Sequence, residues 1–154
     1  MKCCFTGHRN VKVTDELEKR LEDEIVKLIN LGVTDFYAGG AVGWDMLCEK
    51  TVLRLRDAYP VRLNIILPCK EDIFTYKWNE MQKNDLHQIL SLADNVKALS
   101  ENFTKECYKN RNRQLTENAD FCICFYNEKR QRCGTAQTVR MAEKKGMTVV
   151  NLYR

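Results

Sequence analysis

The sequence predicts a doubly wound α/β fold, in which helices cover both faces of a largely parallel sheet. Short apolar runs typical of buried strands alternate along the chain with amphipathic stretches of helical period. Three of the strand-to-helix junctions contain glycine, as turns at the carboxyl edge of a parallel sheet often do. Because the 154 residues contain no linker or repeat, we expect one domain over residues 1–154.

The first junction follows a short apolar run, residues 2–5, which predicts a buried first strand. In the segment Thr6-Gly7-His8-Arg9 that comes next, Gly7 lets a ligand approach the backbone closely. Thr6 offers a hydroxyl group, and His8 and Arg9 offer hydrogen-bond donors suited to phosphate. The four residues together therefore favour a ligand at this junction, whereas His8 alone would favour an ordinary surface loop.

An amphipathic helix is expected after this junction. Thr14 or Asp15 would cap its start, and Asp15 and Glu18 have the spacing of a capping box. Gly32 is placed to end the helix. The apolar residues recur at helical spacing and predict one stripe that faces the sheet: Leu17, Leu21, Ile25 and Leu28.

The second junction is the glycine cluster that follows the second strand, residues 34–38. Gly39 and Gly40 can take positive φ, and they leave no Cβ to keep a ligand from the backbone. A helix from about Gly43 to Asp57 would point its free N–H groups and positive dipole end at the turn. The turn therefore predicts a bound anion, most often a phosphate, and a tight turn without a ligand is the alternative.

The third strand, residues 61–67, ends at Pro68, which would lie with Cys69 at the same edge of the sheet. Residues 70–93 are less regular but include a helix, and residues 96–99 predict a short fourth strand. Three aromatic residues crowd the start of the irregular segment, and they suit a lid, a stacking surface for a base, or packing in the core or at an interface: Phe74, Tyr76 and Trp78.

A helix that is expected to run to Asn118 carries two arginines, Arg111 and Arg113, on either side of Asn112. Residues two apart do not share a helical face, so one arginine is expected to point to the site and the other to solvent. A fifth strand follows at residues 120–126.

The third junction begins with a basic loop, residues 129–132, and reaches Gly134 and Thr135 at the start of another helix. Gly146 would end that helix, and residues 147–152 predict the last strand. Since all three glycine junctions would meet at one edge of the sheet with arginines nearby, they favour a small ligand that carries phosphate.

Composition describes an ordinary globular protein, with 44% hydrophobic and 30% charged residues. A net charge of +4 is too mild to indicate a nucleic-acid partner by itself. No apolar run is long enough to span a bilayer, and the first strand begins at Lys2 and leaves no room for a signal peptide. We therefore expect a cytoplasmic protein that does not bind membranes.

The chain contains eight cysteines but no C-x-x-C pair, and it has only two histidines, so that zinc-site spacing is missing. A disulfide framework is not expected in a cytoplasmic chain with its own core. We expect most of the cysteines to be small buried apolar residues, and we expect no metal site and no cofactor: Cys3, Cys4, Cys48, Cys69, Cys107, Cys122, Cys124 and Cys133.

The junctions together resemble the SLOG superfamily, the Rossmann-like group named for Smf/DprA and LOG proteins, and in particular its small bacterial YpsA-like branch. The resemblance covers nearly the whole chain. It rests on these motifs in order: Phe5-Thr6-Gly7-His8-Arg9, Gly39-Gly40-Ala41-Val42-Gly43-Trp44-Asp45, Pro68, Trp78, Arg111-Asn112, Ala119-Asp120 and Gly134-Thr135-Ala136. The resemblance implies a Rossmann-like fold. It also implies ligand-binding roles for Thr6, Gly7, His8, Arg9, Gly39, Gly40, Gly43, Asp45, Pro68, Arg111, Asn112, Gly134 and Thr135.

LOG enzymes, to which the superfamily is linked, cleave the N-glycosidic bond of a nucleoside monophosphate. Their motif resembles P-G-G-x-G-T-x-x-E, with an arginine upstream whose place Arg111 takes here. Thr138 stands at the position of the glutamate. Glycosidic cleavage needs a carboxylate to stabilise the oxocarbenium-like transition state or to activate water, and threonine supplies neither. Asp45 and Glu49 are the candidate substitutes for catalysis.

Three functions remain open. The leading hypothesis is binding or sensing of a nucleotide-derived ligand such as an ADP-ribose-like molecule, with Arg9 and Arg111 on phosphate. The second is a LOG-like nucleotide hydrolase. The third is DprA-like binding of single-stranded nucleic acid, favoured by the basic loop at residues 129–132 beside Tyr126 but disfavoured by the mild net charge. The missing G-x-G-x-x-G excludes hydride transfer from consideration.

A homodimer is also expected. SLOG relatives commonly pair through helices that flank the site, and this chain has surplus apolar residues around Phe74 and Trp78.

Overall fold

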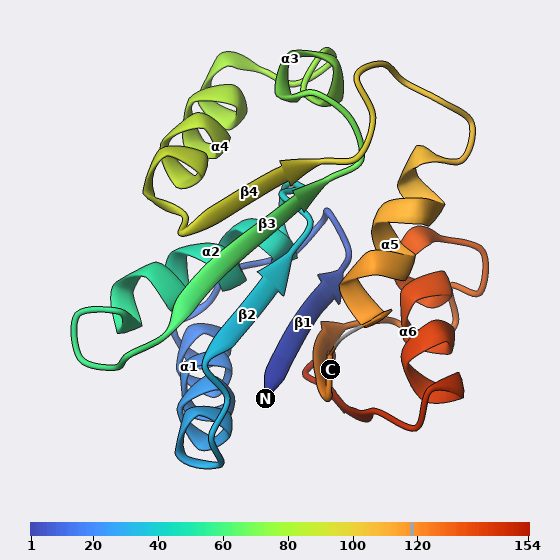
Figure 1. Ribbon diagram of the computed structural model, residues 1–154. Helices are drawn as coiled ribbons and strands as arrows, with labels where there is room; N and C mark the ends of the chain where they lie inside the picture. The colour runs from blue at the N-terminus through green and yellow to red at the C-terminus, as the bar shows by residue number, and fades with distance from the viewer. Residues whose placement is uncertain (118) are drawn as a thin grey trace.

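A six-stranded parallel sheet forms the centre of the computed structural model, which describes residues 1–117 and 119–154 (Figure 1). Its strands lie in the order β4-β3-β2-β1-β5-β6, and every neighbouring pair is parallel. The strands are β1 (Lys2–Gly7), β2 (Asp35–Ala38), β3 (Arg62–Leu67), β4 (Asn95–Ala98), β5 (Phe121–Phe125) and β6 (Thr148–Asn151). This arrangement confirms the predicted doubly wound, Rossmann-like α/β fold.

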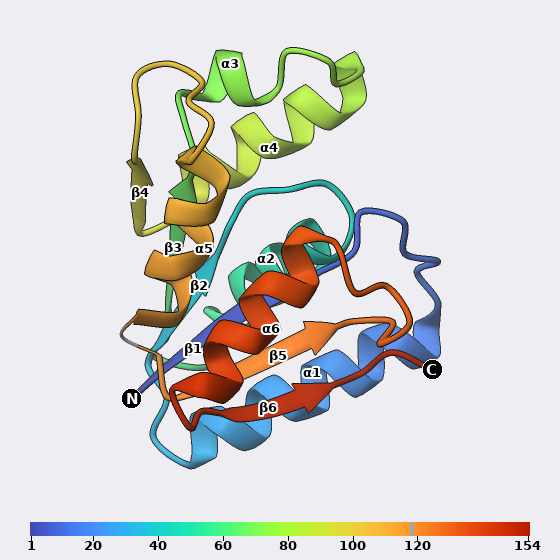
Figure 2. The same cartoon turned by 90° about the vertical axis from the view of Figure 1, so that its right-hand side faces the viewer.

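Helices cover both faces of the sheet, as Figures 1 and 2 show. One face carries α1, α2 and α4, and the other carries α5 and α6, which pack against each other. The helices are α1 (Asp15–Asn30), α2 (Trp44–Leu55), α3 (Glu71–Phe74), α4 (Glu80–Leu92), α5 (Cys107–Glu117) and α6 (Gly134–Lys144). Because β1 leads outward to β2 while β5 leads to β6, the connections diverge between β1 and β5, where ligands bind in folds of this type.

Two hydrophobic clusters separate the layers. Successive residues of a strand point to opposite faces, so Cys3 and Phe5 of β1 pack in the cluster beneath α1 and α2, whereas Cys4 packs in the cluster beneath α5 and α6. The structure describes all eight cysteines: seven are buried, Cys133 is partly exposed, and none forms a disulfide. The cysteines therefore act mainly as small core residues, as expected.

Most predicted elements occur within one or two residues of their expected bounds. The cap of α1 differs from the capping-box prediction, because Thr14 is the capping residue and its side chain accepts a hydrogen bond from the backbone N–H of Leu17 at 3.1 Å. Helix α2 ends at Leu55 rather than Asp57. The predicted end of α5 at Asn118 lies outside the described residues. Among the residues that are described, no helix has both the length and the apolar character needed to cross a bilayer.

Candidate functional site

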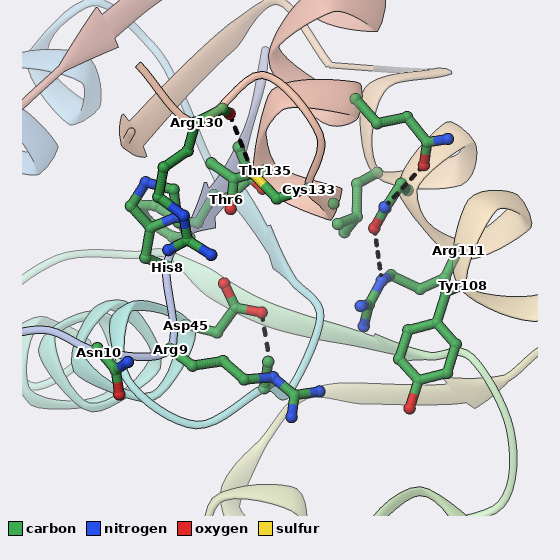
Figure 3. Close-up of a pocket in the computed structure, with 17 residues that line it drawn as sticks. Thr6, His8, Arg9, Asn10, Asp45, Tyr108, Arg111, Arg130, Cys133 and Thr135 are labelled. Carbon is green, nitrogen blue, oxygen red and sulfur yellow. Dashed lines mark hydrogen bonds between the residues drawn. The ribbon is translucent and has the colours of Figure 1, made fainter. Parts of the chain in front are cut away.

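A cavity of about 440 Å³ opens at the carboxyl edge of the sheet, at the switch point between β1 and β5 (Figure 3). The end of β1 and the loop after it form one wall, α5 forms a second, and the loop from β5 into α6 forms a third. Its polar lining residues are Thr6, His8, Arg9, Asn10, Asp45, Tyr108, Arg111, Asn112, Arg130, Cys133, Thr135 and Gln137. Residues from far-apart segments of the sequence therefore meet in one place, as the parallel topology requires.

Nine of the residues predicted for ligand binding line this cavity, and they include residues from each of the three glycine junctions. They are Thr6, Gly7, His8, Arg9, Asp45, Arg111, Asn112, Gly134 and Thr135. The other predicted residues do not contribute to its lining: Gly39, Gly40, Gly43, Pro68 and the candidate catalytic residue Glu49. The glycine turn after β2 is thus placed differently from the first and third junctions.

The prediction that a phosphate occupies the Gly39-Gly40 turn requires correction, because carboxylates of the chain itself occupy it. The backbone N–H of Gly40 donates to Glu49 Oε2 at 3.0 Å, and that of Ala41 donates to Asp45 Oδ2 at 3.2 Å. Glu49 is fully buried and Asp45 nearly so. The N–H groups that would hold an anion at this turn are therefore already bonded.

Packing explains why these positions are glycine. A Cβ on Gly40, whose φ is +74°, would lie 2.6 Å from a methyl group of Leu67 in the core. A Cβ on Gly43, whose φ is +85°, would lie 2.1 Å from the carbonyl oxygen of Arg9. Both glycines thus serve close approach within the protein, in a backbone conformation that other residues rarely adopt.

Arg111 links α5 to the glycine turn. Its Nη1 donates to the carbonyl oxygen of Gly39 at 2.5 Å, and its Nε donates to Asn112 Oδ1 at 2.9 Å. The guanidinium group is buried, and its Cζ lies 5.7 Å from the centre of the Tyr108 ring and 6.0 Å from that of Phe74. Arg113 is exposed, so the expected division between the two arginines is confirmed.

Two buried carboxyl groups face Arg111, and their pKa values are raised. Burial raises the pKa of Asp45 to about 6, although the positive charge of Arg111 opposes the shift. Burial, followed by the charge of Asp45, raises the pKa of Glu49 well above its usual value. Glu49 Oε1 has no hydrogen-bond partner among the described residues. Burial thus favours the protonated form of Glu49, and Arg111 serves mainly as the countercharge of Asp45.

Two other arginines leave their positive charges free for a ligand. Arg9 and Arg130 are exposed, and neither guanidinium group has an ion-pair or hydrogen-bond partner in the part of the chain that the structure describes. In Figure 3 the guanidinium group of Arg9 lies beside Tyr108, while Arg130 approaches from the opposite side near Thr6. These are the groups that can bind a phosphate without losing an internal contact.

The start of α6 supplies neutral donors. Cys133 caps the helix, and its Sγ accepts from the backbone N–H of Ala136 at 3.5 Å. The N–H groups of Gly134 and Thr135 precede the first intrahelical bond and therefore need another partner. The hydroxyl groups of Thr135 and Thr6 also line the cavity without a hydrogen-bond partner among residues 1–117 and 119–154. These donors at a helix N-terminus suit an anion.

His8 has a more limited role than its sequence position indicated. Its Nε2 lies 2.8 Å from the backbone nitrogen of Asn127 and accepts its hydrogen bond. Burial, and secondarily the charge of Arg130, lowers the pKa of His8. The neutral ring thus holds the loop after β5 in place, and only its Nδ1–H can be offered to a ligand.

Sequence reasoning did not assign several lining residues to the site. Tyr108 lies three residues before Arg111 on α5, and this helical spacing, which places both on one face, was the signal that could have identified it. Arg130 and Cys133 belong to the loop at the third junction, where the basic charge was noted only as a nucleic-acid feature. Asn10 and Gln137 have no distinguishing pattern in the sequence.

The fold and the cavity at its switch point define a Rossmann-like α/β domain with a candidate site at the carboxyl edge of its sheet. The YpsA family model, described as the YspA SLOG family, matches residues 3–152, so this chain belongs to that family. A UPF0398 protein of Halalkalibacterium halodurans is 26% identical over 129 residues, which are 79% of this chain and 64% of that protein. A UPF0398 protein of Macrococcus caseolyticus is 26% identical over 113 residues, 72% of this chain and 61% of that protein.

A similar fold is found among solved structures. DNA processing protein A of Helicobacter pylori, described for its single-stranded DNA binding mode, matches 97% of this chain and 63% of its own with a TM-score of 0.66 at 17% identity. This chain spans less than two thirds of the length of all three of these proteins.

Proposed function

We propose that this protein binds or senses a nucleotide or nucleotide-derived ligand, such as an ADP-ribose-like molecule, in the cavity between β1 and α6. One observation carries the proposal: donors without a hydrogen-bond partner among the described residues line the same cavity from two sides, the loop after β1 and the junction between β5 and α6. Arg9 follows β1, Arg130 follows β5, and the N–H groups of Gly134 and Thr135 begin α6. Fixed positive groups around a helix N-terminus favour phosphate.

The glycine turn has a supporting role in this proposal. Arg111 and Asp45 are bonded to the turn rather than free, so they shape the cavity wall and give it a fixed arrangement. Asp45 still lines the cavity, and its second carboxylate oxygen can accept a hydrogen bond from a ribose hydroxyl group. A phosphate at α6 and a ribose toward Asp45 would use both ends of the cavity.

A LOG-like hydrolase is the weaker alternative. Thr138, at the position of the LOG glutamate, is fully buried, and its hydroxyl group donates to the carbonyl oxygen of Gly134 at 2.9 Å. Glu49 is buried behind the glycine turn, so Asp45 is the only one of the candidate carboxylates that lines the cavity. We therefore expect no release of free base from nucleoside monophosphates, and a robust release would favour the hydrolase.

Binding of single-stranded nucleic acid is a second candidate, favoured by two observations. The structurally similar DNA processing protein A is described for single-stranded DNA binding, and the exposed loop with Lys129, Arg130 and Arg132 borders the cavity. The aromatic residue next to that loop does not support it, because Tyr126 is 92% buried and packs among core residues. Affinity for a deoxythymidine oligonucleotide that exceeds affinity for any mononucleotide would favour this candidate.

A comparison of Arg130→Ala with Arg132→Ala tests the proposed function. Both arginines belong to one exposed loop, but only Arg130 lines the cavity. Titration calorimetry with AMP and ADP-ribose should show binding to the wild type, about tenfold weaker binding to Arg130→Ala through loss of a charge-assisted hydrogen bond, and little change in Arg132→Ala. Equal losses in both variants would indicate general electrostatic attraction and would contradict a phosphate site in the cavity.

A further inference from the structure

A second cavity, an aromatic groove of about 780 Å³, adjoins the phosphate cavity on the side of α3. Its aromatic walls come from α3, the segment after it, the loop before α5 and α5 itself: Phe74, Tyr76, Trp78, Phe103 and Tyr108. Arg9 and Tyr108 line both cavities, so the two spaces meet at these side chains. In Figure 3 the side chain of Arg9 extends toward the Tyr108 ring.

We infer that the aromatic groove binds the purine-like base of the ligand whose phosphate lies at the start of α6. This inference rests on the proposed function and extends it, because it assigns a place and a recognition chemistry to the other end of the ligand. Because Arg9 and Tyr108 line both cavities, a ligand whose phosphate contacts Arg9 would lie next to the groove.

The rings in the groove form a connected series. Phe74 contacts Trp78 edge-on with ring centres 5.1 Å apart, and it contacts Tyr108 at 6.0 Å. Tyr108 in turn lies 6.3 Å from the ring of Phe103. Phe74 itself is buried, so the ring surface open to a flat base belongs to the partly exposed Trp78 and Tyr108 and to the exposed Phe103.

Exposure and edge chemistry favour a base over a purely apolar occupant. Phe103 is 64% exposed and Tyr76 is 77% exposed, so the rim of the groove presents large aromatic surfaces to solvent. The amide of Gln82 and the carboxylate of Asp72 also line it. These polar groups suit the hydrogen-bonding edge of a base, which has both donors and acceptors.

The test compares a ligand that has a base with one that lacks it. Calorimetric affinities for AMP and ribose 5-phosphate would be measured on the wild type, Phe103→Ala, Tyr76→Ala and the control Met81→Ala. Met81 is 74% exposed but lies outside the groove lining. Because Phe103 and Tyr76 are exposed, neither substitution is expected to disturb folding.

We expect the wild type to bind AMP about 5- to 100-fold more tightly than ribose 5-phosphate, the range that stacking of a base on aromatic side chains provides. Phe103→Ala should remove most of this preference for AMP and leave the affinity for ribose 5-phosphate within twofold of the wild type. Tyr76→Ala should reduce the preference for AMP, and Met81→Ala should retain it. Equal wild-type affinities for the two ligands would overturn the base site but leave the phosphate site standing. Absence of binding by both ligands would overturn the proposed function as well.

A homodimer interface is the competing occupant of the aromatic groove, as the sequence led us to expect. Sedimentation velocity on the same variants distinguishes it. If Phe103→Ala or Tyr76→Ala converts a dimer to an 18.0 kDa monomer without changing the ratio of the two affinities, the groove binds a second copy and the inference is wrong. If the variants keep the molecular mass of the wild type but have a lower ratio of AMP affinity to ribose 5-phosphate affinity, the result supports the base site.

Discussion

Replacing Arg111 with alanine should destabilise the protein much more at pH 8 than at pH 5. At pH 8 the nearly buried carboxylate of Asp45, whose pKa is raised to about 6, is charged and has Arg111 as its neighbouring countercharge. Arg111 acts on Asp45 through its charge and makes no direct ion pair with it among the described residues, so its removal should cost less than breaking a buried ion pair, about 3–5 kcal/mol, but more than the loss of the Gly39 hydrogen bond alone. At pH 5 Asp45 is mostly protonated, so the main cost is the unpaired carbonyl oxygen of Gly39, about 1–3 kcal/mol.

The sign of the pH dependence follows from the direction of the pKa shift. A carboxyl group whose pKa is raised in the folded state binds more protons there than in the unfolded state, so stability falls as pH rises through that window. In the wild type this window lies between about 4 and 6 for Asp45. Arg111 lowers the pKa of Asp45, so without Arg111 the window extends upward and more stability is lost at pH 8.

Urea unfolding at the two pH values, followed by tryptophan fluorescence, measures this effect as the free energy of unfolding. Arg113→Ala is the matched control, since Arg113 lies on the same helix but is exposed and should change stability by less than about 0.5 kcal/mol. In an Asp45→Asn background the pH dependence of the Arg111→Ala effect should largely disappear. An equal loss at both pH values, or a greater loss at pH 5, would refute the assignment of Arg111 as a buried countercharge.

Three further substitutions test the packing and the electrostatics of the fold. Gly7→Ala should lower the free energy of unfolding by about 1–3 kcal/mol, because the added Cβ would lie 2.3 Å from the Trp44 ring. Gly134→Ala should lower it by less than about 0.5 kcal/mol, because the nearest described atom would lie 3.6 Å from the added Cβ. Similar melting temperatures of the two variants in thermal unfolding would contradict this packing. Asp35→Asn should cost about 0.5–2 kcal/mol at pH 7, because the hydrogen bond and charge of Arg62 lower the pKa of Asp35 to about 2. This stabilisation is present above about pH 4 and is lost as pH falls through 2, so urea unfolding should show a smaller cost at pH 3, and a larger one would count against the ion pair.

The sequence was sufficient to predict the sheet and the edge of it at which the cavity lies. The alternation of apolar strands with amphipathic helices predicts a parallel sheet, and parallel strands necessarily bring Thr6 and Thr135 to one edge. The glycine turn was misinterpreted because glycine spacing does not show which partner the backbone N–H groups have. Asp45 and Glu49, one helical turn apart just after the turn, were the signal that the chain supplies its own hydrogen-bond acceptors there.

The aromatic groove could not be predicted with the same certainty. Its walls combine α3, the loop before α5 and α5, and the loop has no period from which its course could be derived. Phe103 lies in that loop and Tyr108 on the helix, so only the folded chain brings them together with Phe74. Loop positions of this kind depend on tertiary contacts rather than on local pattern.

Backbone amide chemical shifts during titration with ribose 5-phosphate test the central claim most directly. If the phosphate lies at the start of α6, the amides of Gly134 and Thr135 should shift most, because they lack an internal partner. The amides of Gly40 and Ala41 should shift least, because Glu49 and Asp45 already accept their hydrogen bonds. The largest shifts at Gly40 and Ala41, with none at Gly134, would contradict the account.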